Sequence, residues 1–480
     1  MKDAERPEGL VDDGDVLQSP ILHGRASIGQ QIPGTAANHL ARHDGRNGRR
    51  ASDVVAPTDD LLLDGLQRAA FCYFVEAVNP ANGLVADTSR RDSPASIAVV
   101  GFALASYPVA VERGWLTRAE AVARSLAVLR FFHGSDQSGS SEATGYRGFY
   151  YHFLHLRTGA RVWRSELSTI DTALLIAGAL AASIYFDANT PAEIELRELV
   201  DVLYRRIDWR WAQGGAVTIR QGWKPECGFL HYGWEGYSEA IVLYALALGS
   251  PTHPLEGDGY DAWTATYQWE NLYGHDVLYA GPLFVHQFSQ AWIDLRDLRD
   301  RFMREKRSDY FENSRRATYV QREYAQRNPL EFAGYNEHCW GLTAGDGPSD
   351  ELPEVTREPR RLFGYAARGV PYGPDDGTLS CSAVLASLPF APEIVLPAVR
   401  NMIARYPEML ARQQCASGFN PTLAGPDTRA WVSRGHYGLD QGIVVMMIEN
   451  YRTQLLWRLM RDCPFVTTGL RRAGFRGGWL

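Results

Sequence analysis

The sequence predicts an all-α fold, an (α/α)6 barrel of about twelve helices with short β-hairpins and long loop insertions at one rim. Helical periodicity recurs about twelve times over roughly 420 residues, and the strand-like stretches between these segments are short. The helical segments alternate in character, since some are almost entirely apolar and others carry charges along one face. A closed barrel of helix pairs accommodates this alternation, with the apolar helices inside and the amphipathic ones outside.

The predicted helices are placed by their apolar periodicity and, in several cases, by a start signal. Thr117 with Glu120, and Ser168 with Asp171, fit the capping box, in which a hydroxyl and an acid satisfy the first backbone amides. Pro191 suits a first helical position. The helices are expected to begin near Leu61, Ile97, Thr117, Thr169, Pro191, Tyr237, Tyr260, Leu283, Asp309, Leu379, Pro392 and Leu439.

The first four of these segments after Leu61 illustrate the predicted layers. Residues 97–111 and 170–183 are almost entirely apolar, as expected for inner helices, which other helices surround. Residues 117–130 and 193–206 are charged along one face, as expected for outer helices. If inner and outer helices alternate, the segments that precede all inner helices open at one shared rim.

Other parts of the chain limit the domain organisation. Strand-like patterns are confined to 148–156 and 217–232, and the sequence contains neither G-x-G-x-x-G nor a P-loop, which disfavours a nucleotide-binding α/β fold. Residues 1–57 lack Phe, Tyr and Trp and are predicted to be a disordered tail. The composition is constant beyond this point, so that 58–480 is predicted to be a single (α/α)6 barrel domain that carries the catalytic site.

Charge and hydropathy exclude several classes of partner. With 49 basic and 56 acidic side chains among 480 residues, the formal net charge is −7, and nucleic acid is not an expected partner. No apolar run approaches the roughly 20 residues of a membrane span. The first residues show no basic-then-apolar signal pattern, so the sequence as it stands is expected to be cytoplasmic, or periplasmic if a leader is missing. The oligomeric state is left open.

The scarcity or spacing of certain side chains also argues against several kinds of catalytic and metal site. The only lysines are Lys2, Lys224 and Lys306, which leaves almost no candidate for Schiff-base catalysis. The cysteines are scattered and never form C-x-x-C, a spacing that indicates neither a zinc site nor a disulfide framework. His152 and His155 are too close in sequence for a helical metal pair. No metal or cofactor is therefore expected.

The informative feature is the set of residues that precede or begin the predicted inner helices. These segments are rich in carboxylates, Trp and Tyr, and one of them reads Trp163-Arg164-Ser165-Glu166. The candidate site residues selected from them are Asp87, Glu166, Asp171, Trp234, Glu235, Tyr237, Glu239, His286, Gln287, Trp292 and Asp440.

A rim of this composition suits a carbohydrate. Aromatic rings cover the apolar faces of sugars, and carboxylates and Arg bind hydroxyls through charge-assisted hydrogen bonds. Glycoside cleavage needs one protonated carboxylic acid and one carboxylate, without a cofactor. Taken singly, Asp171 or Glu239 could be no more than a helix cap, and each Trp or Tyr a core residue. The prediction therefore depends on their meeting at one rim.

The same segments resemble the bacterial glucoamylase-like family of glycoside hydrolases, whose characterised members include β-1,2-glucanases. The resemblance covers roughly 60–480, and it is specific because the motifs occur in a fixed order. They are Ser96-Ile97-Ala98, residues 166–173 (ELSTIDTA), Tyr237-Ser238-Glu239-Ala240, residues 249–254 (GSPTHP), residues 281–284 (GPLF), Trp292-Ile293-Asp294, residues 310–314 (YFENS), residues 340–344 (WGLTA), Asp440-Gln441-Gly442 and Ile448-Glu449-Asn450.

The resemblance implies an (α/α)6 barrel that hydrolyses β-1,2-glucan with inversion at the anomeric carbon. Glu239 matches the proton donor of the family, and Asp440 matches the base that activates water. Glu235 could exchange roles with Glu239. Asp171 and Glu166 match ligands of the sugar in the cleavage subsite. A proton donor must remain protonated near neutral pH, so burial or neighbouring carboxylates must raise its pKa above the usual value of about 4.3 for Glu.

Other functions remain open from the sequence. A transglycosylase or a phosphorylase would act on the same glucan in the same cleft, and a non-catalytic barrel would bind glycan without cleaving it. A terpene cyclase is set aside because the chain lacks its Asp-rich motif. Residues 329–378 are the candidate lid over the cleft, and the sequence does not decide between endo and exo cleavage or between linear and cyclic glucan.

Overall fold

The computed structural model describes residues 57–350, 361–411 and 414–480. The predicted disordered tail, 1–57, lies outside the described residues except for Pro57, which begins the first helix. Buried hydrophobic side chains from Leu63 to Phe475 form a contiguous core, so both ends of the described chain contribute to the same interior.

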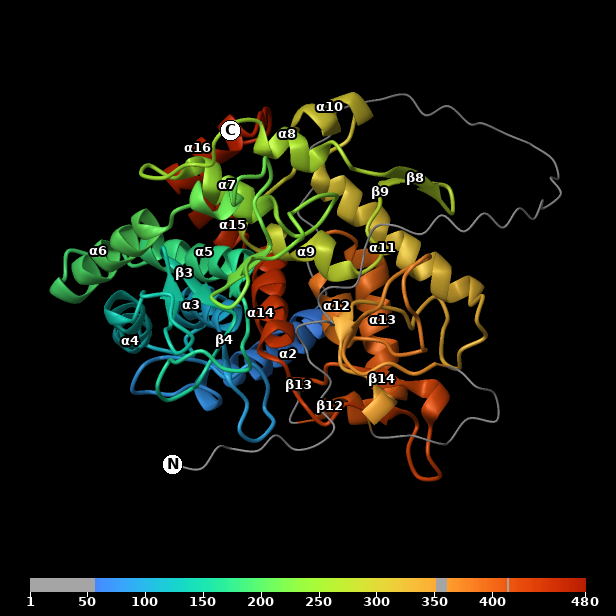
Figure 1. The fold of residues 1–480 in the computed structure, drawn as a ribbon. Helices are drawn as coiled ribbons and strands as arrows, with labels where there is room; N and C mark the ends of the chain where they lie inside the picture. The colour runs from blue at the N-terminus through green and yellow to red at the C-terminus, as the bar shows by residue number, and fades with distance from the viewer. Residues whose placement is uncertain (1–56, 351–360, 412–413) are drawn as a thin grey trace.

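The described residues are mostly helical, with 15 α-helices and several small sheets. Six helices contact one another in a closed ring, in the order α3–α5–α7–α9–α12–α14 and back to α3. In Figure 1, α14 stands near the centre of the view, between α3 and α5 on one side and α12 on the other. The ring helices are α3 (Ile97–Glu112), α5 (Thr169–Tyr185), α7 (Ile241–Gly249), α9 (Leu283–Trp292), α12 (Cys381–Ala386) and α14 (Gly438–Arg452).

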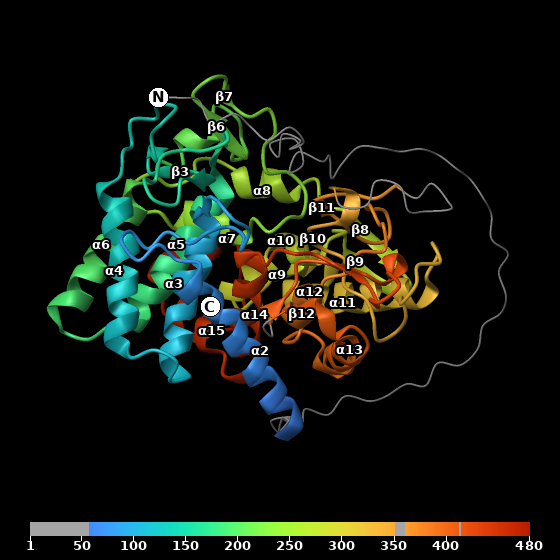
Figure 2. The same cartoon turned by 90° about the horizontal axis from the view of Figure 1, so that it is seen from below.

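Each ring helix also contacts a helix outside the ring. The pairs are α3 with α4, α5 with α6, α7 with α16, α9 with α11, α12 with α13 and α14 with α2. Figure 2 shows α4 and α6 side by side at one edge of the molecule. These outer helices are α2 (Pro57–Glu76), α4 (Arg118–Gly134), α6 (Pro191–Arg206), α11 (Tyr310–Arg327), α13 (Pro392–Arg405) and α16 (Pro464–Arg472).

Burial explains why the two sets differ in composition. Every residue of α3 from Ile97 to Ala110 is buried, and so is every residue of α5 from Thr169 to Ala182. In α6 the buried residues recur at helical spacing, and Arg205 and Arg206 occupy its last turn. The apolar and amphipathic segments of the sequence therefore correspond to ring and outer helices.

Several predicted helix starts differ from the structure. The helix expected from Tyr237 begins at Ile241, because the Ser289 hydroxyl accepts a hydrogen bond from Val242 N at 3.0 Å and donates one to the Glu239 carbonyl. The helix expected near Tyr260 is only six residues long. The additional short helices are α8 (Gly259–Thr264), α10 (Arg301–Lys306) and α15 (Leu455–Arg461), and the 3-10 turns are η1 (Trp211–Gln213), η2 (Pro348–Asp350), η3 (Pro407–Met409) and η4 (Pro421–Leu423).

Short strands of the small sheets directly precede two of the ring helices. An antiparallel five-stranded sheet has the order β2-β3-β5-β6-β7, which is more extensive than the hairpins that the sequence predicts. Strand β1 ends where α3 begins, and β5 ends where α5 begins. The strands of the large sheet are β2 (Gly145–Tyr146), β3 (Phe149–Tyr151), β5 (Leu167–Ser168), β6 (Gly222–Lys224) and β7 (Gly228–Phe229). The paired strands are β1 (Ala95–Ser96) with β4 (Phe153–Leu154), β8 (Trp269–Leu272) with β9 (His275–Leu278), β10 (Ala344–Gly345) with β11 (Ala366–Ala367), β12 (Leu410–Ala411) with β13 (Gln414–Cys415), and β14 (Phe419–Asn420) with β15 (Trp431–Val432).

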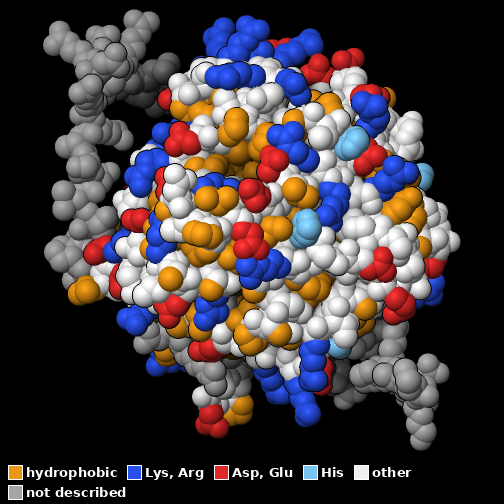
Figure 3. Space-filling model, turned by 90° about the vertical axis from the view of Figure 1, so that its left-hand side faces the viewer, with side chains coloured by type: hydrophobic (Ala, Val, Ile, Leu, Met, Phe, Trp, Pro, Cys, Tyr) orange, Lys and Arg blue, Asp and Glu red, His pale blue; other side chains and the backbone are white. Residues whose placement is uncertain are grey.

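On the face drawn in Figure 3, basic, acidic and hydrophobic side chains are interspersed rather than gathered by type. Among the described residues, no helix combines the length and the apolar character that crossing a bilayer requires.

Candidate active site

The first residues of several ring helices lie next to one another. Ile97 N, at the start of α3, donates a hydrogen bond to the His152 carbonyl at 3.2 Å. Gly438 N, at the start of α14, donates to the Asp87 carbonyl at 2.8 Å. The Ser382 hydroxyl of α12 donates to Asp440 Oδ1 of α14 at 3.0 Å. These contacts bring acids from distant parts of the chain to one end of the ring.

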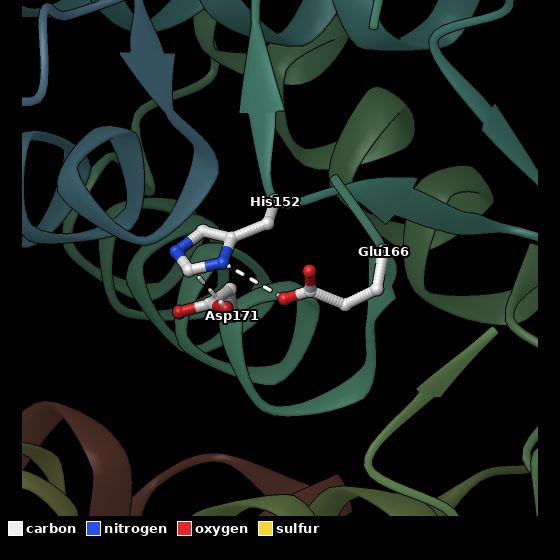
Figure 4. Close-up of side chains that lie close together, drawn as sticks. All are labelled: His152, Glu166 and Asp171. Carbon is white, nitrogen blue, oxygen red and sulfur yellow. Dashed lines mark hydrogen bonds and ion pairs between the residues drawn. The ribbon is translucent and has the colours of Figure 1, made fainter. Parts of the chain in front are cut away.

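His152, Glu166 and Asp171 form a compact cluster at this end (Figure 4). His152 Nδ1 lies 2.9 Å from Glu166 Oε1, and His152 Nε2 lies 3.6 Å from Asp171 Oδ2. The Ser168 hydroxyl donates to Asp171 Oδ2 at 2.5 Å and accepts from Asp171 N at 3.2 Å, so Asp171 also belongs to the N-terminal cap of α5. The imidazole is thus held between two acids, one ahead of β5 and one in the first turn of α5.

The charges of this cluster stabilise one another. Burial disfavours the imidazolium, but the carboxylates of Asp171 and Glu166 outweigh it and raise the pKa of His152 to about 9. Burial likewise disfavours the Glu166 carboxylate, but the neighbouring His152 lowers the pKa of Glu166 to about 2. Near neutral pH, His152 is therefore a cation beside an ionised Glu166.

The same three side chains are candidate metal ligands. One donor atom of each lies within 4.8 Å of the others. An imidazolium has no free lone pair for a metal, and the pKa of His152 near 9 favours that form at neutral pH. A metal ion at this cluster would therefore have to displace the proton from the imidazole.

Glu239 lies in the turn just before α7 and is partly buried. Burial raises the pKa of Glu239 to about 7, with a further increase from the Asp171 carboxylate and a partial offset from a backbone hydrogen bond. The sequence predicts a helix from about Tyr237, with Glu239 in its first turn. The helix α7 begins only at Ile241, so Glu239 instead precedes it. A carboxyl group that is still substantially protonated near neutral pH can act as a general acid.

Asp440 lies in the first turn of α14, on another side of the ring. Burial raises the pKa of Asp440 to about 7, helped by Asp87 and Asp346, while the hydroxyls of Ser417 and Ser382 lower it. Glu239 and Asp440 are thus both partly buried carboxyl groups with a raised pKa, each next to other acids: Asp171 beside Glu239, and Asp87 and Asp346 beside Asp440.

The environment of Asp440 includes two residues that the sequence analysis did not select. Asp346 is buried, accepts a hydrogen bond from the Ser433 hydroxyl at 2.6 Å and forms an ion pair with Arg90. Tyr365 packs its ring on Tyr437, with ring centroids 5.6 Å apart. Asp346 follows a Gly residue within the candidate lid, which is a weak signal, and Tyr365 has no signal at all.

Tyr365 connects the two groups of acids. Burial raises the pKa of its phenol, and the carboxylates of Asp440, Asp87, Asp346 and Asp171 raise it further. The acids around Asp440 and the acid beside Glu239 therefore act on a single hydroxyl. Asp87, Asp171, Asp346 and Asp440 therefore form one acidic cluster, whose members all lie close enough to the Tyr365 hydroxyl to raise its pKa.

The candidate lid, 329–378, is anchored in the parts of it that the structure describes. The Arg368 guanidinium is buried and pairs with Asp376, with Nε 2.7 Å from Oδ1. It also donates to the carbonyls of Gly345, at 2.9 Å, and Gly364, at 3.1 Å. Residues 351–360 of this segment lie outside the described residues. The Arg368 side chain thus connects the two described flanks of the segment, one with Asp346 and the other with Tyr365.

Two predicted sugar ligands are core residues instead. Trp292 is fully buried, and its ring packs against Phe102 with centroids 4.9 Å apart. The Gln287 side-chain amide donates to the Ala383 carbonyl at 2.7 Å and to the Ser387 hydroxyl at 2.8 Å, which joins α9 to α12. Both expectations are corrected, because these side chains point between helices and not into the acidic cluster.

His286 and Tyr237 also take positions behind the cluster. His286 Nε2 lies 3.1 Å from the Ala280 carbonyl, and burial lowers the pKa of His286 to about 4, which keeps the ring neutral. The ring lines a mostly apolar pocket whose lining contains none of the clustered carboxylates. Tyr237 is buried and packs against His286 and Tyr310. The two side chains therefore lie against one another beside the turn that carries Glu239, and their contact with a sugar stays a prediction.

Trp234 and Glu235 are neighbours in sequence but differ in burial. Trp234 is partly buried, and its indole N–H donates to the Thr169 hydroxyl at 3.0 Å, beside the start of α5. Glu235 is exposed. Glu239 is partly buried and its pKa is raised to about 7, whereas Glu235 is exposed to solvent, and this burial favours Glu239 as the proton donor.

Comparisons with known proteins agree with this architecture. The sequence profile of a family described as "Putative glucoamylase" matches residues 231–464. The crystal structure of a putative glucoamylase from Bacteroides uniformis is 30% identical, with a TM-score of 0.77 over 88% of this chain and 98% of that one. An endo-β-1,2-glucanase from Chitinophaga pinensis, solved with sophorotriose and glucose, is 25% identical, with a TM-score of 0.74 over 88% of this chain and 100% of that one.

A curated relative is the exo β-1,2-glucooligosaccharide sophorohydrolase (non-reducing end) of Parabacteroides distasonis. It is 26% identical over 90% of this chain, and the chain spans 60% of the length of that protein. The fold is that of the mostly helical glucoamylase-like proteins. The chain belongs to the "Putative glucoamylase" family, which includes β-1,2-glucanases and sophorohydrolases, and the resemblance seen in the sequence is confirmed.

Proposed function

We propose that the protein is a glycoside hydrolase that cleaves β-1,2-glucan by an inverting acid/base mechanism. The family relatives support the substrate class. The observation that carries the mechanism is the presence of two partly buried carboxyl groups, Glu239 and Asp440, each with a pKa raised to about 7, at one end of the same helical ring. An inverting glycosidase needs two such groups in different protonation states.

The proposed fold is an (α/α)6 barrel. The closed contacts of six ring helices, each with its own outer helix, support this interpretation. In such a barrel the acid-rich ends of α3, α5, α7, α12 and α14 surround one opening, and the opposite end of the ring takes no part in catalysis. The candidate substrate ligands at the opening are Asp87, Glu166, Asp171 and Trp234.

In the proposed reaction, protonated Glu239 gives its proton to the glycosidic oxygen as the bond to the anomeric carbon breaks. Ionised Asp440 removes a proton from a water molecule that attacks the anomeric carbon from the opposite face. The burial that raises both pKa values also strengthens interactions with the developing positive charge on the sugar ring. After one turnover Glu239 is ionised and Asp440 protonated, and exchange with solvent restores both.

The ionised acids beside these groups have complementary roles. Asp171 raises the pKa of Glu239, and Asp87 and Asp346 raise that of Asp440. His152 balances the negative charge of Asp171 and Glu166, which permits two acids to lie close together in a partly buried site. Asp171, Glu166 and Asp87 can then accept hydrogen bonds from sugar hydroxyls.

The decisive experiment is a product profile over time on a panel of β-glucans that differ only in linkage, with and without phosphate. Hydrolysis predicts shorter β-1,2-glucans and no reaction with the other linkages. Sugar phosphate would indicate a phosphorylase, and longer or cyclic products a transglycosylase. Binding without any cleavage would indicate a glycan-binding barrel. Each of these three results would contradict the proposed hydrolysis.

A second measurement tests the stereochemistry. Proton NMR during the first minutes of cleavage distinguishes an α- from a β-configured reducing end. Inversion of a β-1,2 linkage predicts that the α-anomer accumulates first and then equilibrates. Initial accumulation of the β-anomer would indicate a retaining enzyme and would exclude Asp440 as a base of the proposed kind.

A further inference from the structure

A strained turn lies close to the His152–Glu166–Asp171 cluster. Ser165 N donates a hydrogen bond to the Val162 carbonyl at 3.0 Å, and the two central residues of this turn, Trp163 and Arg164, have φ values of 57° and 51°. Positive φ at both central positions defines a type I′ turn, for which Asn and Gly are strongly preferred. A Trp-Arg pair at these positions is thus unfavourable for the backbone.

A buried cation holds this turn in place. Arg161 donates to the Ser165 carbonyl at 2.6 Å and to the Arg164 carbonyl at 2.7 Å, and its guanidinium pairs with Glu226. The Arg161 side chain is only 1% exposed. The fold therefore uses a fully buried guanidinium to maintain an unfavourable turn, and such local strain is typical of functional sites.

The turn presents a large aromatic ring to solvent. Trp163 is 52% exposed, although Trp is among the side chains that proteins bury most extensively. Its ring contacts Phe153, with centroids 5.2 Å apart, and Phe153 stacks on His152, with centroids 3.9 Å apart. A row of three rings in contact, of which Phe153 and His152 are stacked and Trp163 is tilted by 60° to Phe153, therefore leads from the exposed indole to the imidazole beside Glu166 and Asp171.

This continuity distinguishes Trp163 from an ordinary exposed side chain. The indole is fixed by the turn on one side and by Phe153 on the other, and its remaining surface faces solvent. A rigid, half-exposed ring is suited to pack against the apolar C–H face of a pyranose, because little conformational entropy is lost on contact. Figure 4 shows the other end of this row of rings, where His152 faces the two acids.

We propose that Trp163 is the stacking surface of a distal sugar subsite, which binds a glucosyl unit of β-1,2-glucan that lies beyond the units held at the acidic cluster. This inference rests on the proposed function. In this proposal the bound glucan chain extends from the His152–Glu166–Asp171 cluster toward the turn at 162–165.

Substitutions within the turn separate ring stacking from backbone strain. Trp163→Asn removes the ring but introduces a residue that tolerates the left-handed conformation. Arg164→Asn makes the same kind of change at the neighbouring left-handed position and leaves the indole in place. Trp163→Phe retains a smaller ring. All three are made with Glu239→Gln, so that bound glucan is not cleaved during titration calorimetry.

The expected result is a dependence on ligand length. Trp163→Asn should weaken the binding of long linear β-1,2-glucan about tenfold and leave the affinity for the disaccharide sophorose nearly unchanged. Trp163→Phe should lose less affinity, and Arg164→Asn should bind both ligands like the Glu239→Gln parent. Unchanged affinity of the Trp163→Asn variant for the long glucan would overturn the inference.

A measurement without a substitution at the turn keeps the inference testable if the Asn variant does not fold. Trp163 is exposed and should react with N-bromosuccinimide, and mass spectrometry locates the oxidised residue. Long β-1,2-glucan should protect Trp163, whereas sophorose should not. Equal oxidation of Trp163 with and without long glucan would contradict the inference. If the Glu239→Gln parent binds no β-1,2-glucan at all, the proposed function itself fails, and the two failures are distinguished at this step.

Discussion

The Ser382 hydroxyl donates a 3.0 Å hydrogen bond to Asp440 Oδ1, and this bond joins the first turn of α12 to the first turn of α14. It stabilises the ionised form of Asp440 in surroundings that otherwise favour the protonated form. The protonation of the candidate base thus depends on a hydroxyl from a helix that lies more than fifty residues earlier in the chain. Together with the Ser417 hydroxyl, this bond lowers the pKa of Asp440 and so extends the pH range in which Asp440 is ionised toward lower pH.

Ser382→Ala should move the acidic limb of the activity profile. Removing the hydroxyl removes an interaction that lowers the pKa of Asp440, so this pKa should rise above about 7, and the base should be ionised only at higher pH. The pH dependence of kcat/KM measures this directly. Ser183→Ala, which removes a hydroxyl from the last turns of α5, is the control and should leave the limb in place. An unshifted limb in Ser382→Ala would exclude this role.

Glu239→Gln and Asp440→Asn should each lower kcat by about 100- to 10,000-fold, because each removes a proton-transfer group. Circular dichroism and thermal unfolding should show that both variants fold. Glu235→Gln is the matched control, since Glu235 is exposed and close in sequence, and it should retain activity. Full activity in both Glu239→Gln and Asp440→Asn would remove the assignment, and a loss confined to Glu235→Gln would transfer the acid role to Glu235.

His152→Gln should destabilise the protein in a pH-dependent way. The folded-state pKa of His152 is raised from 6.5 to about 9, so the stabilisation is complete below pH 6.5 and is lost as the pH rises through 9. The folded-state pKa of Glu166 is lowered from 4.5 to about 2, so its contribution is present above pH 4.5 and is lost as the pH falls toward 2. The substitution should cost roughly 3–5 kcal/mol of unfolding free energy between these limits, as expected when one member of a buried ion pair is removed.

Urea unfolding at several pH values checks this prediction. The difference in unfolding free energy between the unmodified chain and His152→Gln should be largest between about pH 4.5 and 6.5 and should shrink toward pH 9. His155→Gln provides the control, since His155 is exposed and lies on the same segment. A difference that is constant from pH 5 to pH 9 would show that the imidazolium does not stabilise the fold.

Trp234→Ala should weaken substrate binding more than chemistry. The indole N–H donates to the Thr169 hydroxyl, so the ring lies beside the start of α5. Loss of its packing on a sugar should raise KM roughly 2- to 10-fold with little change in kcat. Trp234→Phe keeps a ring and loses only the N–H donor, and it should show a smaller increase. An unchanged KM in Trp234→Ala would exclude Trp234 as a sugar ligand.

Tyr365→Phe should lower kcat/KM by about 3- to 10-fold, the effect expected for one lost hydrogen bond to a substrate or to water in the site. The ring contact with Tyr437 is kept, so stability should change little. Tyr372→Phe is the control, because Tyr372 is 67% exposed and follows Tyr365 closely in the chain. Equal kinetics of the two variants would show that the Tyr365 hydroxyl does not contact the substrate.

The inner and outer helices could be predicted from sequence because their signal is local. The apolar runs at 97–111 and 170–183 correspond to α3 and α5, whose residues are buried almost throughout. The capping hydroxyls of Thr117 and Ser168 also take their expected places. A helix start that depends on a distant side chain was not predictable, as Ser289 shows for α7.

The aromatic and polar residues of the site were predicted less well. Trp234 and Trp292 have the same side chain and both lie near predicted inner helices, but Trp292 is fully buried and Trp234 is not. A single sequence carries no signal that separates a ring in the core from a ring at the rim. Asp346 and Tyr365 were missed because neither lies on a helix or strand with a periodic pattern, and only the fold brings them to the acids.

The sequence by itself determined the helical fold class, the family and the acids that precede the ring helices, since periodicity, capping and motif order are properties of neighbouring residues. The tertiary structure alone decided which of those acids are buried together and which pKa values rise. Desolvation and charge interactions sum over groups from every segment that reaches the site, and only folding brings Asp87, Asp346 and Asp440 close enough to act on one another.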